Sequence, residues 1–346
     1  MNSTRGLCAI IPTRNRRDDL LVCLASLSRQ SCLPAEIIIV DSSTNLAGDE
    51  AEVYGIAAAP VSLRYIRARR AGVASQRNQG LDLVGEDSVY VLFLDDDVVL
   101  EPDYCAEMIA LLDDKPTAAG VGGWIVNPQA PPFERTLYWF LRLFLIYGNQ
   151  PGQVLSSGFN TPLFVGRRSD VFRAECLEGG NMCLRRDHLR DLQFDSRYER
   201  FAGYAYGEDL DFTYALGRRG ELWVTPQARM HHNVSPAARM HEHRFGICQV
   251  VNRALFVRKH FGNSLYHLTC FVWSMLGIML LNAGMVMRGR PMDRLLGNIV
   301  GLIVAPIELR RLFRANGSYG NAAVDGLSQV CVANDVRRPI KRGSGT

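Results

Sequence analysis

The chain has 346 residues, of which 47% are hydrophobic and 21% are charged, so it is long and apolar enough to bury one large core or two. Its formal net charge of +4 is too small to indicate a nucleic-acid-binding protein. Its nine cysteines form no CxxC pair, which argues against a disulfide framework or a zinc ribbon and favours a reducing compartment.

The first third of the chain alternates apolar runs with stretches of helical periodicity. The apolar runs predict strands at residues 7–12, 36–40, 61–66, 89–94 and 118–126. The periodic stretches predict helices at residues 18–30, 72–83 and 102–112. Strands that alternate with helices of this length predict parallel pairing with right-handed crossovers. We therefore expect a doubly wound nucleotide-binding half.

The middle of the chain is less regular. Residues 133–148 form an apolar run that is too short to span a bilayer. Its Tyr138, Trp139 and Tyr147 suit either a core helix or a helix at a membrane interface. Further strands are predicted at residues 177–185, 221–225 and 228–231, and a further helix at residues 208–218.

The last part of the chain is the most apolar. Residues 265–287 are almost uncharged and about long enough to cross a membrane, and the shorter run 295–307 suits a re-entrant or interfacial segment. Spanning the membrane, lying on it and forming a buried helical hairpin remain alternatives. Basic side chains that suit an anionic membrane surface, or form a tail without a partner, are Arg310, Arg311, Arg314, Arg337, Arg338, Lys341 and Arg342.

Three consecutive carboxylates, Asp95, Asp96 and Asp97, follow the predicted strand 89–94. Ligands of open α/β sheets bind at that edge, and crowded carboxylates favour a divalent cation among them. The alternative is a solvated acidic turn. No GxGxxG follows the first strand and no GxxxxGK[ST] occurs, which disfavours a dinucleotide oxidoreductase and a P-loop enzyme.

An ordered set of motifs resembles the family 2 glycosyltransferases, particularly the bacterial branch that builds surface polysaccharides and includes rhamnosyltransferases. The motifs are IIPTRNR, IIIVDSS, RNQGL, FLDDDVVLEPDY, EGGNMCLRRD, FDSRY, GEDLDF and ARMHHNVSP, over roughly residues 7–235. The resemblance implies a GT-A fold, which is a Rossmann-like, mostly parallel sheet with flanking helices. It also implies an inverting transfer that depends on Mg²⁺ or Mn²⁺.

The resemblance also implies nucleotide-binding residues. Asp41 would accept a hydrogen bond from the base of the donor nucleotide, although Asp-Ser-Ser is also good capping chemistry after a strand. Pro12, Thr13 and Arg14 would wall the base. Arg77 would face the base or the diphosphate.

The three aspartates would divide between ribose and metal. Asp95 and Asp96 are assigned to the nucleotide. Asp97, with Asp95 and His231, is assigned to the cation, and His232 is an equally visible candidate.

The motif GEDLDF implies the catalytic base. Asp209 matches the family position, and Glu208 is the second choice. Alternatively, these acids only stabilise the N-terminus of their helix. Gly179, Gly180 and Asn181 would lie against the donor sugar or the acceptor, unless the glycines form a β-bulge.

The segment after Asn233 would be a mobile lid over the diphosphate, or merely a solvated segment. Its polar side chains are Arg239, His241, His243 and Arg244.

We therefore expect a catalytic domain at residues 1–240, with a nucleotide-binding half at 1–126 and an acceptor half at 127–240 that includes an interfacial helix at 135–147. Residues 241–346 would be a helical, membrane-associated region with a basic tail. The expected partners are a nucleotide-sugar donor, a saccharide or lipid-linked acceptor and the cytoplasmic face of the inner membrane, with no nucleic acid. Rival functions are a sugar nucleotidyltransferase, a glycoside hydrolase and a non-catalytic nucleotide-sugar-binding scaffold.

Overall fold

The computed structural model describes residues 6–44, 61–127, 135–164, 168–199, 205–233 and 240–314. Residues 1–305 form one compact unit and residues 306–346 a second, and each is considered by itself. Several basic residues named above lie outside the described ranges. They are Arg239, Arg337, Arg338, Lys341 and Arg342.

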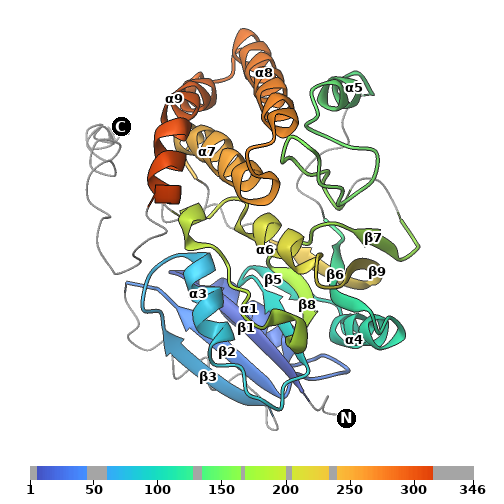
Figure 1. Ribbon diagram of the computed structural model, residues 1–346. Helices are drawn as coiled ribbons and strands as arrows, with labels where there is room; N and C mark the ends of the chain where they lie inside the picture. Colours follow the sequence, from blue (N-terminus) through green and yellow to red (C-terminus); the bar gives the residue numbers. More distant parts are fainter. Residues whose placement is uncertain are drawn as a thin grey trace, which may run out of the picture. The chain divides into compact units, whose positions relative to one another are not determined.

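A single mixed sheet of nine strands organises the described part of the first unit (Figure 1). Its first part is parallel, in the spatial order β3 (Ser62–Arg67), β2 (Glu36–Asp41), β1 (Leu7–Thr13) and β4 (Tyr90–Leu94). Thr13 lies opposite Asp41 in this register, so the carboxyl ends of β1 and β2 meet at one edge. The doubly wound prediction holds for these four strands.

The second part of the sheet mixes strand directions. It contains β5 (Val98–Leu100), β6 (Ala118–Ile125), β7 (Phe172–Ala174), β8 (Asn181–Arg185) and β9 (Glu221–His232). β8 lies between β4 and β6 and is antiparallel to both, whereas β9 is parallel to β6. β5 and β7 were not predicted, and the two short strands expected at 221–231 are one strand, β9. The pairing of β5 with β9 places Val98 opposite His232, so His232 lies close to Asp97, the residue before Val98.

Helices cover both faces of the sheet because side chains of a strand alternate between its faces. They are α1 (Arg17–Leu27), α3 (Val73–Leu81), α4 (Tyr104–Asp114) and α6 (Glu208–Leu216). Ala9 and Ile11 of β1 lie in a core with side chains of α1 and α4, and Ile10 lies in a second core with side chains of α3 and α6. Burying each large apolar side chain contributes about 1.5–3 kcal/mol, so both faces hold the strand ends in place.

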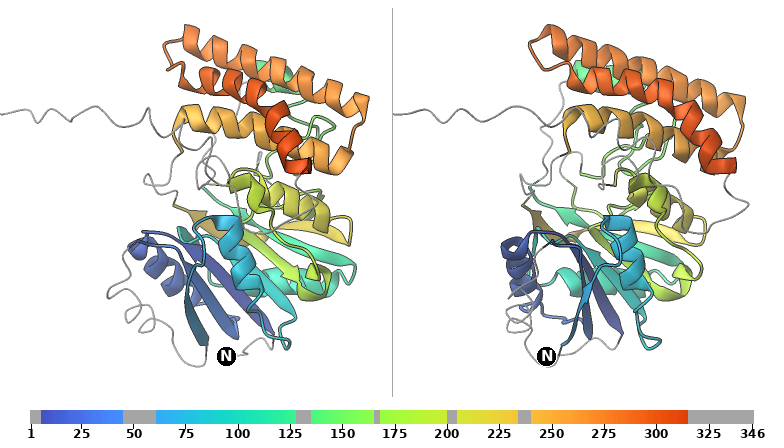
Figure 2. Two further views of the ribbon diagram at one scale, coloured as in Figure 1. Left: turned by 60° about the vertical axis from the view of Figure 1, so that its left-hand side comes forward. Right: turned by 90° about the vertical axis from the view of Figure 1, so that its left-hand side faces the viewer.

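The remaining helices are α5 (Arg135–Leu143), α7 (Glu242–Phe261), α8 (Leu265–Met287) and α9 (Asp293–Arg314). Part of the segment predicted to form a lid, residues 234–239, lies outside the described residues, whereas His243 and Arg244 lie in the first turn of α7. Gly262 ends α7 with a φ of 69°. α8 has the predicted bounds, whereas α9 starts before the predicted run and continues through Pro306. Figure 2 shows α7, α8 and the first part of α9 lying side by side.

Candidate active site

The ends of β1 and β2 are joined by side-chain hydrogen bonds. The buried Asp41 accepts hydrogen bonds from the backbone N–H of Ser43 at 2.7 Å, from the Ser43 hydroxyl at 2.5 Å and from the hydroxyl of Tyr65. Gln76 of α3 donates to the backbone oxygens of Thr13 and Val40, at 2.9 Å and 2.6 Å. Asp41 therefore caps the turn that follows β2, which was the alternative to its predicted role in binding the base. α3 packs against the same edge of the sheet through Gln76.

Basic side chains lie among the three aspartates. Arg16 donates to Asp96 at 2.8 Å and to Asp97 at 3.1 Å, and Arg77 donates to Asp95 at 2.9 Å. Thr13 also donates to Asp96, at 2.6 Å. Burial raises the pKa of Asp96 to about 6, although Arg16 and Thr13 oppose this shift. The positive charge expected among these carboxylates is thus supplied partly by the chain itself.

Asp95, Asp97 and His232 form a group that could hold a metal ion, because one ligand atom from each lies within 4.8 Å of the others. His232 Nε2 lies 3.1 Å from an oxygen of Asp97. Burial would lower the pKa of His232, but the hydrogen bond and charge of Asp97 raise it. The two carboxylates suit Mn²⁺ or Mg²⁺ and the imidazole could complete the site, so these residues fit the expected cation.

The structure does not bring His231 to this group. Successive side chains of a strand point to opposite faces, so His231 and His232 of β9 separate. The half-exposed His231 lies 4.0 Å from Glu101 instead. The geometry of the described residues therefore favours His232, which the sequence left as an equal candidate, over His231 as a metal ligand.

Arg77 is buried between two carboxylates. It donates to Asp95 at 2.9 Å and to Glu208 at 3.0 Å, and so connects the edge of β4 with the start of α6. A Cβ on Gly179 would collide with its guanidinium, and a Cβ on Gly180 would collide with the carboxylate of Asp95. The glycine pair forms a turn before β8 and permits this close approach, so a bulge within the strand is not its role.

Asn181 is held by the scaffold. Its amide oxygen accepts from the Tyr104 hydroxyl at 2.6 Å and from the Gly123 N–H at 3.1 Å, and its amide nitrogen donates to Gly123 O at 2.9 Å. These contacts fasten β8 to β6 and α4. The side chain predicted to meet a sugar therefore has a structural role in this arrangement.

The two acids at the start of α6 differ in their surroundings. Glu208 is buried and paired with Arg77, and burial together with the charge of Asp209 raises its pKa. Asp209 is partly exposed and accepts only backbone N–H groups among the contacts found, from Leu210 at 2.8 Å and Gly179 at 3.4 Å. Asp209 is therefore the more accessible carboxylate.

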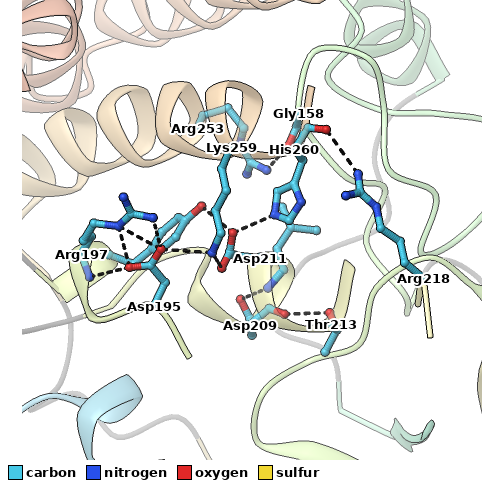
Figure 3. A network of polar contacts seen from close by, with 12 residues as sticks. Gly158, Asp195, Arg197, Asp209, Asp211, Thr213, Arg218, Arg253, Lys259 and His260 are labelled. Atoms are coloured by element: carbon cyan, nitrogen blue, oxygen red, sulfur yellow. Dashed lines mark hydrogen bonds and ion pairs between the residues drawn. The ribbon is translucent and has the colours of Figure 1, made fainter. Parts of the chain in front are cut away.

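A polar network holds α6 against α7. The buried Asp211 accepts from Lys259 at 2.7 Å and from the Tyr198 hydroxyl at 3.2 Å, and it lies 2.8 Å from His260 Nε2 (Figure 3). Lys259 also reaches Asp195 at 3.1 Å. Burial would raise the pKa of Asp195, but Arg197 and Lys259 lower it to about 2. This network fixes the turn of α6 that carries Asp209.

A cavity of about 350 Å³ joins the acid groups. Its wall includes Asp95 and His232 from the metal group and Glu208 and Asp209 from α6. The other predicted site residues in its wall are Arg77, Gly179, Gly180 and Asn181. The predicted residues outside its wall are Pro12, Thr13, Arg14, Asp41, Asp96, Asp97 and His231.

Three residues that were given no role from the sequence belong to the site. Arg16 follows the first strand and pairs with two of the aspartates. Glu178 lines the cavity, and burial with the charge of Asp209 raises its pKa to about 8. Arg253 of α7 also lines the cavity. The motifs PTRNR and EGGN contain the first two, whereas nothing in the sequence marked Arg253.

The chain is similar to known glycosyltransferases in sequence and in fold. The sequence profile described as glycosyl transferase family 2 matches residues 8–175. The chain is 36% identical over 116 residues to the uncharacterized glycosyltransferase YibD of Escherichia coli (strain K12), a match that spans 33% of each protein. It therefore covers about one third of the length of this curated relative.

Two solved structures share the fold. The mannosyltransferase PcManGT from Pyrobaculum calidifontis, in complex with GDP-Man and Mn²⁺, superposes with a TM-score of 0.53 at 16% identity and covers 89% of both chains. GalNAc-T7 with UDP, GalNAc and Mn²⁺ superposes with a TM-score of 0.51 at 15% identity, over 80% of this chain and 57% of that one. The sheet is thus of the GT-A type, and residues 8–175 are similar in sequence to the glycosyl transferase family 2 profile.

Proposed function

We propose that the protein is a metal-dependent, inverting glycosyltransferase that moves a sugar from a nucleoside diphosphate sugar to an acceptor hydroxyl. One observation carries this proposal: a single cavity has Asp95 and His232 in one part of its wall and Asp209 in another. A cation site and a separate carboxylate base are what displacement of a diphosphate by a hydroxyl requires.

In this proposal Asp209 is the base. Its carboxylate takes the proton of the acceptor hydroxyl while the bond from the anomeric carbon to the diphosphate breaks. Glu208 is a poorer base, because its salt bridge to Arg77 occupies it. Asp95, Asp97 and His232 would hold Mn²⁺ or Mg²⁺, which supplies Lewis-acid neutralisation of the leaving diphosphate.

The edge of β1 and β2 would receive the nucleoside. Asp41 and Thr13 lie in register there, and Thr13 is hydrogen-bonded to Asp96 next to the metal group. Pro12 and the exposed Arg14 lie at the end of the same strand. A nucleoside at this edge would place its diphosphate toward Asp95 and the cavity.

Two proteins of similar fold support the donor class, since PcManGT was solved with GDP-Man and GalNAc-T7 with UDP. We propose a saccharide or lipid-linked acceptor, and a role in envelope polysaccharide synthesis at the cytoplasmic face of the inner membrane. Within the described residues, α8 is the helix long and apolar enough to cross a membrane, which supports membrane association weakly. The domain boundary at residue 240 also stays a proposal.

The test is to measure donor binding and turnover separately in Asp209→Asn. Binding is read as thermal stabilisation by nucleoside diphosphate sugars with Mn²⁺, and turnover as release of the nucleoside diphosphate. We expect stabilisation to persist and turnover to fall by about 10²–10⁴-fold. The matched control is Asp18→Asn, a carboxylate with 95% side-chain exposure that should change neither quantity. Unchanged turnover in Asp209→Asn would remove Asp209 from the mechanism.

A further inference from the structure

One face of α8 is apolar and exposed along its whole length. Its exposed residues recur three or four positions apart, and they include Leu268, Val272, Leu276 and Leu280. This spacing places them on a single side of the helix. No Asp, Glu, Lys or Arg occurs between Leu265 and Met287, so the face has no charged group to interact with water.

Two neighbouring helices extend this surface. α9 exposes Leu296, Ile299 and Ile303 on the solvent side of its first part, and α5 exposes Trp139 and Leu143. The Trp273 side chain of α8 donates to the backbone oxygen of Leu143 at 2.8 Å, which places α5 beside α8. We call the exposed apolar faces of α5, α8 and residues 293–305 of α9 the docking surface.

The opposite face of α8 is fastened to the rest of the unit. His267 lies 3.0 Å from the Ser156 backbone oxygen, and Asn282 donates to Asn298 of α9 at 2.6 Å. These contacts are 15 residues apart, which is roughly 22 Å of helix axis. A Cβ on Gly277, between them, would collide with Phe144. α8 therefore lies along the protein instead of projecting from it.

α9 is fastened in the same manner. The buried Asn298 donates to the Gly246 backbone oxygen at 2.9 Å and to Gln249 at 3.1 Å, both on α7. A Cβ on Gly297 would collide with the backbone of α7. The small-residue face of α9 is thus used inside the chain and is not left for another helix.

We propose that the docking surface enters one leaflet of an anionic lipid bilayer and that α8 does not cross the membrane. This inference does not depend on the proposed glycosyl transfer. A spanning α8 would need about 30 Å of hydrocarbon along its axis. Both ends of α8 are fixed to the same unit. A spanning α8 would therefore carry α7 into the bilayer, together with buried polar residues that include Gln249, Asn252 and Arg253.

The composition of the surface favours lipid over a second copy of the chain. Tyr266, Trp273 and Trp139 are exposed on it, and such amphipathic rings suit the headgroup level. Arg142 stacks on Trp139 at 5.0 Å, and the exposed Arg288 and Arg290 follow α8. Guanidinium groups beside an apolar face complement anionic headgroups, whereas two copies of this surface would face like charges.

The experiment measures sedimentation of the full chain with vesicles of phosphatidylcholine, with and without phosphatidylglycerol. We expect binding that is stronger with phosphatidylglycerol and that Leu276→Glu weakens at least about tenfold, because a charge would enter the apolar layer. The matched control is Val22→Glu on α1, since Val22 is 51% exposed and Leu276 is 46% exposed. Thermal unfolding of both variants checks that they fold.

Labelling distinguishes one leaflet from spanning. Met287→Cys places a thiol at the end of α8, at a side chain that is 87% exposed. A membrane-impermeant maleimide should label it on bound vesicles without detergent, from the side to which protein was added. Three results would each overturn the proposal. The first is labelling only after detergent is added, and the second is no vesicle binding by the parent chain. The third is a dimer that Leu276→Glu dissociates, with no lipid binding by the parent chain.

Discussion

The two adjacent histidines of β9 provide a sharp test of the metal group. His232 contributes one of three ligand atoms that lie within 4.8 Å of one another, whereas His231 lies against Glu101. Removing even an outer partner of a metal ligand commonly costs 10–100-fold in affinity. His232→Ala should therefore weaken Mn²⁺ binding at least about 100-fold, or about 2.7 kcal/mol, whereas His231→Ala should change it less than about threefold.

The assay is calorimetric titration of Mn²⁺ in the presence of a nucleoside diphosphate at constant pH. The raised pKa of His232 adds a second expectation. Mn²⁺ competes with the proton on this imidazole, so Mn²⁺ affinity of the parent should fall as the pH drops through that pKa, and His232→Ala should lose this dependence. Equal losses in the two variants, or a larger loss in His231→Ala, would refute the placement of the metal group.

Three further predictions concern the cavity and its support. Gly179→Ala would press a methyl group into a buried guanidinium, so we expect unfolding to become about 1–3 kcal/mol easier in urea titrations, while Gly85→Ala, with open space around it, should be close to neutral. Burial raises the pKa of Glu178 from 4.5 to about 8, so between these pH values its carboxyl group is protonated in the folded, metal-free protein and ionised in the unfolded chain. Its free energy of unfolding should fall between pH 4.5 and 8 by up to roughly 4 kcal/mol, and Glu178→Gln should make this fall smaller. Lys259→Met removes an ammonium from the buried Asp211, and we expect a loss of about 1–3 kcal/mol, with turnover reduced more than donor binding; unchanged turnover would show that the network does not position α6.

Local pattern was sufficient for the parallel half of the sheet. The strand ending at Leu94 and the helix Leu265–Met287 have the predicted positions, because long apolar runs determine them directly. β5 has only three residues and gave no such signal. α7 lies in the region predicted to be helical, but its bounds were not predicted, because its central residues 246–257 are buried on all sides and leave no one-sided apolar period.

The sequence predicted which kinds of residue the candidate site contains, but not which of them contact one another. The motifs placed Asp95 and Asp209 far apart in sequence, and the structure joins them through a cavity. The choice between His231 and His232 depended on the pairing of β5 with β9, a long-range register that periodicity does not reveal. The salt bridge of Arg77 with Glu208 likewise spans 131 residues, so the pairing that distinguishes Glu208 from Asp209 could not be read locally.

The most direct measurement of the central claim is anomalous X-ray scattering from crystals of the protein with Mn²⁺ and a nucleoside diphosphate. The proposed function predicts one manganese peak within ligand distance of Asp95, Asp97 and His232, with the diphosphate reaching from it into the cavity that Asp209 lines. A manganese peak elsewhere, or a diphosphate that leaves this cavity empty, would contradict it.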